Sequence, residues 1–294
     1  MASDAPTPGC TQALVVGDAT LDGRLLHARS MDWDAYPLLI DHPTIFVRQP
    51  DDGIPHVIVG FPANISPYQG MNAEGISIAS NKIDPANRRQ VDWTGRSHAQ
   101  IQGMILKKAR ILDEARAFFE AQDEFGTGLS AIGDGPNRTA LIYEVTANAR
   151  TARTLERGVV WQTNHFVSDA MRGKDEEPSN GSMRRYERVE QLVAPNGEVT
   201  HYGQIDALTM VNLMRDRVNP WTHEESPKGV FEDGDSIATN GAVYQVVFDP
   251  EHLWFWAAGG ALPVPEQPFV GFSLAELLGY PDAAPVDPDV FPPL

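Results

Sequence analysis

The stretch Gly9-Cys10-Thr11-Gln12-Ala13-Leu14-Val15-Val16-Gly17 decides which fold and which chemistry this chain can have. It places the single cysteine of the chain directly after a glycine, at the head of an apolar segment. Cleavage of the Gly9–Cys10 bond would make Cys10 a new N-terminus, with a thiol nucleophile and an α-amine base on one residue. A lone cysteine is more commonly a small buried hydrophobe, so the rest of the chain must support the chemical interpretation.

Composition limits the class of protein and its partners. The 294 residues are 42% hydrophobic, which suits one large domain or two small ones. A single cysteine excludes an intramolecular disulfide and every cysteine-rich metal site. The formal net charge of −17 repels polyanions, so we expect neither nucleic acid nor a membrane surface as partner. Because the first residues show no signal segment and no later run is long enough to span a membrane, we expect a cytoplasmic protein.

Hydrophobic periodicity groups strands and helices in blocks. Strands are predicted at 13–16, 25–29, 44–48, 56–61, 75–81, 129–133, 139–145, 159–163, 236–248 and 253–257. Helices are predicted after a Ser97 N-cap and at 113–119, 182–193, 204–218 and 273–278. This order fits an α+β fold, with two sheets and two helical layers, better than a βαβ alternation. Beyond Ala261 we expect a proline-rich segment that wraps the surface.

Several common catalytic and binding motifs are absent from the sequence. It contains no Gly-x-Ser-x-Gly elbow, no phosphate-binding glycine loop with lysine, no dinucleotide fingerprint and no closely paired histidines. We therefore predict neither a cofactor nor a metal ion, and hydrolase chemistry would depend on Cys10.

Four blocks, in the right order, resemble the N-terminal-nucleophile (Ntn) hydrolases related to isopenicillin N acyltransferase and choloylglycine hydrolase. The blocks are Gly9–Trp33, Gly70–Asn81, Thr163–Phe166 and Ser182–Arg188, and the segment through Val246–Pro250 is also similar. In the first block the spacing Arg29-x-x-Asp32 matches, with Ser30 in place of the usual asparagine. The resemblance implies a four-layer αββα sandwich of two antiparallel sheets between helical layers. It also implies a zymogen, with residues 1–9 as an autocleaved leader and residues 10–294 as one catalytic domain with a proline-rich C-terminal extension.

The resemblance implies a role for each of six residues. Cys10 is the nucleophile, Arg29 lies beside its sulfur and Asp32 orients its α-amine, while the oxyanion donors and the completing arginine are Asn164, the Asn81 main-chain N–H and Arg185. The chemistry agrees, because a thiol pKa of about 8.5 and an amine pKa of about 7.7–8.0 let the amine take the thiol proton. From the residues alone, a salt-bridged strand end, turn asparagines and a solvated helix face remain open alternatives.

The implied function is an autoprocessed cysteine amidohydrolase or acyltransferase. It would cleave the carbon–nitrogen amide bond of a small N-acyl substrate, linear or attached to a β-lactam, through a Cys10 thioester. A choloylglycine hydrolase or penicillin V acylase type of amidase is the close alternative, and a non-catalytic binding protein on the same scaffold is the alternative from another class.

The sequence says less about which molecule accepts the acyl group from the thioester, and about which acyl group the site binds. Water is the favoured acceptor in an acidic protein, and a coenzyme A thioester is the less favoured partner. The one basic cluster that offers coenzyme A a local patch is Arg172, Lys174, Arg184, Arg185 and Arg188. Trp33, Phe61, Tyr68 and Phe166 flank the blocks and are candidates for an acyl pocket, although such aromatic residues also form ordinary core. Monomer and homo-oligomer both remain open.

Overall fold

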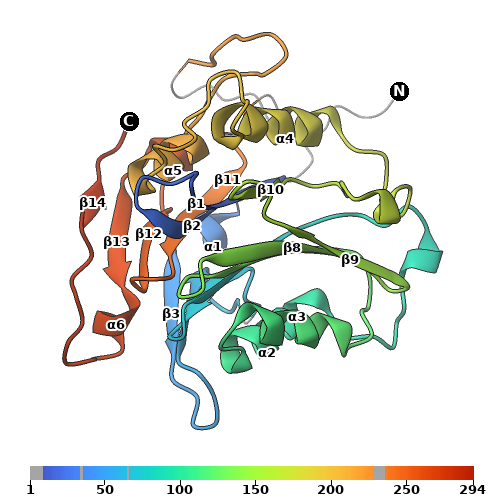
Figure 1. Cartoon of the computed structure of the whole chain (residues 1–294), viewed down its shortest axis with the longest axis horizontal. Helices are drawn as coiled ribbons and strands as arrows, with labels where there is room; N and C mark the ends of the chain where they lie inside the picture. Colours follow the sequence, from blue (N-terminus) through green and yellow to red (C-terminus); the bar gives the residue numbers. More distant parts are fainter. Residues whose placement is uncertain (1–8, 34–35, 65, 228–235) are drawn as a thin grey trace.

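The structure is a computed structural model that describes residues 9–33, 36–64, 66–227 and 236–294. Two antiparallel sheets, each of seven strands, face one another, and helices cover their outer faces (Figure 1). The predicted α+β arrangement of two sheets between two helical layers is therefore confirmed. The predicted leader, residues 1–9, lies outside the described residues except for Gly9.

The first sheet carries the N-terminal hairpin. Its order is β10-β1-β2-β11-β12-β13-β14. The strands are β1 (Cys10–Gly17), β2 (Gly23–Asp32), β10 (Val159–Gln162), β11 (Ala242–Asp249), β12 (Trp254–Ala258), β13 (Phe269–Ser273) and β14 (Val290–Phe291). β1 pairs with β2 so that Cys10 stands opposite Met31 and Gln12 opposite Arg29. Because side chains alternate along a strand, the side chains of Cys10, Gln12, Arg29 and Met31 share one face of the sheet.

The second sheet has the order β3-β4-β5-β6-β7-β8-β9. Its strands are β3 (Thr44–Arg48), β4 (His56–Gly60), β5 (Gln69–Asn72), β6 (Ile76–Asn81), β7 (Gly128–Asp134), β8 (Thr139–Thr146) and β9 (Ala149–Thr154). Ala79 on β6 pairs with Gln69 on β5, so the side chains of these two residues share a face.

The two longest helical pairs form the outer layers. The helices are α1 (Pro37–Ile40), α2 (His98–Lys108), α3 (Leu112–Glu120), α4 (Asn180–Val193), α5 (Ala207–Met214) and α6 (Leu274–Leu277), with short 3₁₀ helices η1 (Arg88–Gln90), η2 (Asp169–Met171) and η3 (Val264–Glu266). α4 and α5 pack on the first sheet, whereas α2 and α3 pack on the second. Ser97 caps α2 as predicted, in a capping box with Gln100.

The structure corrects several predicted boundaries. Strands β5, β9, β13 and β14 were not predicted, and the helix expected at 204–218 is the shorter α5. β9 reads Ala-Arg-Thr-Ala-Arg-Thr and is only half-buried at a sheet edge, so it lacks an apolar face to signal it. The proline-rich segment beyond Ala261 does more than wrap the surface, because β13 and β14 extend the first sheet at its edge, where proline is tolerated.

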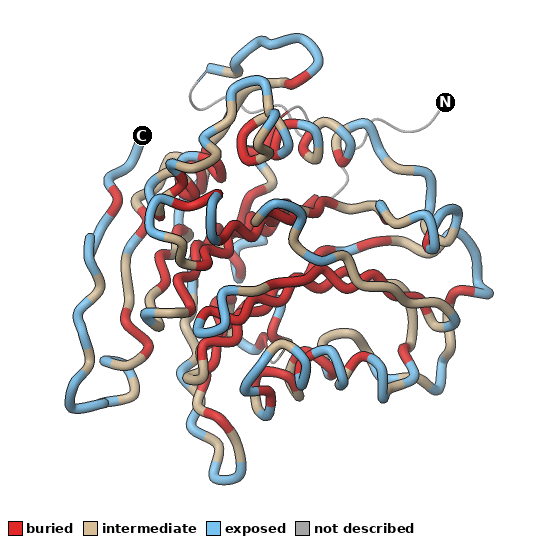
Figure 2. The backbone as a smooth tube through the Cα atoms, in the orientation of Figure 1, coloured by how far each residue is buried: buried red, intermediate tan, exposed pale blue. Residues whose placement is uncertain are grey.

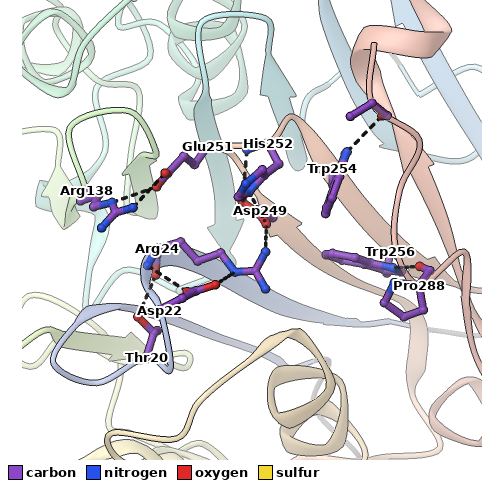
Figure 3. A network of polar contacts seen from close by, with 11 residues as sticks. Thr20, Asp22, Arg24, Arg138, Asp249, Glu251, His252, Trp254, Trp256 and Pro288 are labelled. Atoms are coloured by element: carbon purple, nitrogen blue, oxygen red, sulfur yellow. Dashed lines mark hydrogen bonds and ion pairs between the residues drawn. The ribbon is translucent and has the colours of Figure 1, made fainter. Parts of the chain in front are cut away.

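Polar contacts stabilise one end of the sandwich (Figure 3). Arg24, at the start of β2, donates to the fully buried carboxylate of Asp249 at 2.7 Å. Arg138, between β7 and β8, donates to Glu251 of the other sheet through two contacts of 2.9 Å. The Arg24–Asp249 contact joins β2 to β11 within the first sheet, whereas the Arg138–Glu251 pair links the two sheets. Cys10 pairs near the other end of β2, so both contacts lie far from the cysteine. Burial is concentrated in the facing strands (Figure 2). Among the described residues, no helix combines the length and the hydropathy needed to cross a membrane.

Candidate active site

Cys10 is buried at the start of β1, and its sulfur lies beside a buried cation. Nη2 of Arg29 donates to Cys10 Sγ at 3.3 Å and to the carbonyl of Ser80 at 2.7 Å. Nη1 of Arg29 donates to Oε1 of Gln69 at 2.6 Å. The predicted neighbour of the sulfur therefore lies within hydrogen-bonding distance of it.

The Gly9–Cys10 peptide bond is held by hydrogen bonds on both sides. The Gly9 carbonyl accepts the main-chain N–H of Asp32 at 2.8 Å. The Cys10 N–H donates to Oδ1 of Asn164 at 2.7 Å, and the Cys10 carbonyl accepts Nη1 of Arg185 at 2.5 Å. The three partners come from β2, from the segment after β10 and from α4, so residues distant in sequence meet at this bond.

Arg185 and Asn164 act on each other as well as on Cys10. Nη2 of Arg185 donates to Asn164 Oδ1 at 2.9 Å, and Nη1 donates to Thr11 Oγ1 at 3.0 Å. An arginine can only donate, so Asn164 must present its oxygen here, and its Nδ2 donates to the Lys82 carbonyl at 2.7 Å. Burial lowers the pKa of Arg185, and the nearby Asp32 and Cys10 oppose that shift. In this arrangement it is the amide oxygen of Asn164 that faces Cys10.

The side chain of Asn81 connects the end of β6 to the start of β1 and the end of β10. Its Nδ2 donates to the carbonyls of Thr163 at 2.8 Å, Gln162 at 3.2 Å and Cys10 at 3.3 Å. The side chain therefore joins β6 of the second sheet to β1 and β10 of the first. The role expected for Asn81 concerns its main-chain N–H, so this contact is an additional one.

The carboxylate of Asp32 is oriented by the residue that departs from the family pattern. Ser30 Oγ donates to Asp32 Oδ1 at 2.7 Å, and Nε2 of Gln245 donates to Ser30 Oγ at 3.3 Å. Serine thus supplies a hydroxyl donor where asparagine is usual. Both Ser30 and Asp32 are buried.

Sequence reasoning missed three supporting residues: Gln69, Ser80 and Ser182. Ser182 Oγ accepts the main-chain N–H of Asn164 at 2.8 Å and contacts Nδ1 of His165 at 2.8 Å. Ser182 opens the fourth block and Gln69 directly precedes the second, so position beside a block was the available signal. Burial, with Arg185 and Arg153 nearby, lowers the pKa of His165 to about 4, so this imidazole is neutral at pH 7.

The four candidate aromatic residues do not share one location. Trp33 and Phe61 pack against the apolar cluster that contains Cys10, and Phe61 stacks on Tyr244 with ring centroids 6.3 Å apart. Tyr68 is partly exposed, and its carbonyl accepts the N–H of Ser80 at 2.9 Å. Phe166 belongs to a separate core cluster with Ile83, Leu129 and Met171.

The basic cluster of the sequence does not form a single surface. Arg185 is buried at Cys10, and Arg188 is paired with Asp216 through contacts of 2.8 and 2.7 Å. Arg184 stacks on Trp221 at 4.6 Å, and Arg172 pairs with Asp169. The alternative of a solvated face is therefore wrong for Arg185 and Arg188, whose side chains are buried against partners. Over the described ranges, no group of three or more metal-ligating side chains is gathered.

Comparisons with known proteins bear on the family and the fold of this chain. A family model described as acyl-coenzyme A:6-aminopenicillanic acid acyl-transferase matches residues 22–252. A comparison with curated protein sequences gave no match. Among solved structures, the Caenorhabditis elegans ortholog of N-acylethanolamine-hydrolyzing acid amidase is 14% identical, with a TM-score of 0.56, over 82% of this chain and 93% of that one. Two variants of conjugated bile acid hydrolase from Clostridium perfringens are 12% identical, with TM-scores of 0.55 and 0.58, over 90% of this chain and 93% of theirs. At these identities the likeness shows a shared fold, and it confirms the predicted Ntn-hydrolase sandwich.

Proposed function

Because the chain belongs to the acyl-coenzyme A:6-aminopenicillanic acid acyltransferase family, we propose that it is an autoprocessed cysteine amidohydrolase or acyltransferase with Cys10 as its nucleophile. The family match begins at residue 22, so the assignment of Cys10 depends on the site geometry. The observation that carries it is the 3.3 Å contact between Arg29 and the Cys10 sulfur, at a peptide bond held by Asp32, Asn164 and Arg185.

The first reaction is the removal of the leader. Cys10 Sγ attacks the Gly9 carbonyl carbon, the Cys10 nitrogen leaves and takes a proton, and the leader is then held as a thioester. Water hydrolyses this thioester, which frees a leader that ends in the Gly9 carboxylate and restores the thiol. The Asp32 N–H on the Gly9 carbonyl supports this step, because a donor at that oxygen stabilises the negative charge that develops there.

The second reaction uses the freed α-amine. It replaces the amide nitrogen that lies 2.7 Å from Asn164 Oδ1, and a pKa of about 7.7–8.0 suits it to accept the thiol proton near neutral pH. The thiolate then attacks the carbonyl carbon of an N-acyl amide, the amine product leaves with a proton from the α-ammonium, and an acyl thioester forms at Cys10. We assign two oxyanion donors, as in the family pattern: the second N–H of Asn164 Nδ2, whose first donates to the Lys82 carbonyl, and the Asn81 main-chain N–H.

Water is the proposed acceptor that releases the acyl group from the thioester. The dispersal of the basic residues among internal partners supports water over a coenzyme A thioester, because a highly charged donor needs an accessible basic patch. The amide substrate is of the N-acyl class, and Trp33 and Phe61, which pack against the apolar cluster that contains Cys10, are the candidates for contact with its acyl group.

Two measurements test the proposal. Intact mass of the active protein should lack residues 1–9, and an active enzyme that retains Met1–Gly9 would overturn the use of the amine as base. Acyl release from a panel of N-acyl amides, with and without coenzyme A, should be lost in Cys10→Ala and should not require coenzyme A. A wild-type protein that releases no acyl group and whose thiol resists iodoacetamide until it unfolds would instead support a non-catalytic binding protein.

A further inference from the structure

The guanidinium of Arg29 is buried, and in the described part of the chain no ion pair with a carboxylate is found for it. Its exposed fraction is 1%, and among the described residues its acceptors are the Cys10 sulfur, the Ser80 carbonyl and Oε1 of Gln69. Buried cations are usually paired with a carboxylate, because an unpaired charge is costly away from water. Here neutral oxygens hold the cation, so its charge is not cancelled.

Of the three acceptors of Arg29, Gln69 makes the shortest contact, and it lies on the opposite sheet. It lies on β5, it is fully buried, and its Oε1 is 2.6 Å from Nη1 of Arg29. Arginine only donates, so the amide oxygen must face it, and no partner for the buried Nε2 of Gln69 is found in the described part of the chain. A glutamine that served packing alone would gain nothing from this arrangement, since a buried amide nitrogen without a partner is unfavourable.

We propose that Gln69 is a positioning residue that fixes Arg29 beside Cys10 while leaving the guanidinium charge available to the thiolate. This inference rests on the proposed role of Cys10 as nucleophile. Glutamate has the same shape and also accepts from Arg29, but its carboxylate would neutralise the cation and repel the thiolate. The neutral amide is therefore the chemically significant choice at position 69.

The test compares Gln69→Glu and Gln69→Met by the pH dependence of the Cys10 alkylation rate. Iodoacetamide is the probe, intact mass is the readout, and circular dichroism checks folding. In Gln69→Glu the pH midpoint of alkylation should rise, because the added carboxylate opposes the negative charge of the thiolate, and alkylation at pH 7 should slow by about tenfold or more. In Gln69→Met the rise should be smaller, because Arg29 keeps its charge and its contact with Ser80.

Gln102→Glu is the matched control. Gln102 is equally buried, but it lies on α2, and its Nε2 donates to Ser130 Oγ on the helix-covered face of the second sheet. The pH midpoint of Cys10 alkylation in this variant should equal that of the wild type. A wild-type midpoint in Gln69→Glu, or an equal shift in Gln102→Glu, would overturn the inference.

Two further comparisons cover the cases in which Gln69→Glu keeps its leader or does not fold. If Gln69→Glu blocks leader removal, its precursor is compared with a Gly9→Ala precursor that carries Gln69, with intact mass used to follow only the chains that still hold the leader. If Gln69→Glu does not fold, Gln69→Met decides: an unchanged thiol midpoint in that variant overturns the inference. The proposed function and this inference can fail separately. Activity that survives Cys10→Ala would refute the proposed function. The alkylation midpoints of the Gln69 variants are measured without substrate, so they test the inference alone.

Discussion

Replacing Gly9 by alanine should slow removal of the leader, because a β-carbon at this position collides with Arg185. An ideal β-carbon would lie 2.5 Å from Nη2 and 2.9 Å from Cζ of that side chain. The guanidinium cannot retreat cheaply, since it holds the Cys10 carbonyl, Thr11 and Asn164. Relief must then come from moving the Gly9 carbonyl away from the Asp32 N–H, which removes a donor from the reacting carbonyl.

The size of the effect follows from the cost of overpacking. Inserting one carbon into a tightly packed site costs about 1–3 kcal/mol. If that cost falls on the reactive geometry, cleavage should slow by about 5- to 150-fold, at about 1.36 kcal/mol for each factor of ten. Intact mass spectrometry of purified precursor, sampled over time, gives the rate.

Gly241→Ala provides the matched control for this prediction. A β-carbon there would lie 3.6 Å from Thr239 Oγ1 and 3.7 Å from the β-carbon of Asp32, which are ordinary contacts. Its cleavage rate should be close to that of the wild type. A Gly9→Ala precursor that is cleaved at the wild-type rate or faster would refute the reasoning.

Three further outcomes are expected, on pH, on stability and on activity. His165 has a pKa of about 4 in the fold against 6.5 when unfolded, so its contribution is present above pH 6.5 and is lost as the pH falls towards 4. The loss of stability in urea unfolding between pH 7 and pH 5 should be about 2 kcal/mol smaller in His165→Gln than in the wild type; an equal loss in the two proteins would contradict this. Asp249→Ala removes the fully buried carboxylate that accepts from Arg24, which keeps its pair with Asp22, and should cost about 1.5–3 kcal/mol in urea unfolding while leaving the kcat of the folded protein unchanged. Ser30→Ala removes the donor to the Asp32 carboxylate and should lower kcat/KM about 5- to 10-fold, for about 1 kcal/mol of hydrogen bonding, whereas Ser30→Asn should retain activity.

Local patterns in the sequence predicted the strands of the N-terminal hairpin, and the resemblance assigned Arg29 its place beside the Cys10 sulfur. β1 and β2 pair as neighbouring strands, so this contact depends on local geometry. Asn164 and Arg185 required the resemblance to a family, because they lie 154 and 175 residues from Cys10 along the chain and no spacing rule connects them. The two helical layers followed from periodicity, since apolar residues at helical spacing must face a sheet.

The order of residues along the chain did not predict the contacts between the two sheets. Gln69 reaches Arg29 because β5 of one sheet faces β2 of the other, and that stacking depends on the whole core. In the sequence, Gln69 stands in a four-residue strand that contains glycine and asparagine, a composition typical of turns. Ser182 was overlooked for a similar reason, because a serine at the start of a helix is normally explained as a cap.

On the proposed mechanism, the wide sequence separation of the residues around the Gly9–Cys10 bond sets when the leader can leave during biosynthesis. Cys10 is synthesised early, but Asn164 and Arg185 follow 154 and 175 residues later. A nascent chain therefore carries an inert cysteine until α4 has docked on the first sheet. Loss of the leader then marks a chain whose core is assembled, and a misfolded chain keeps its leader and remains inactive in the cell.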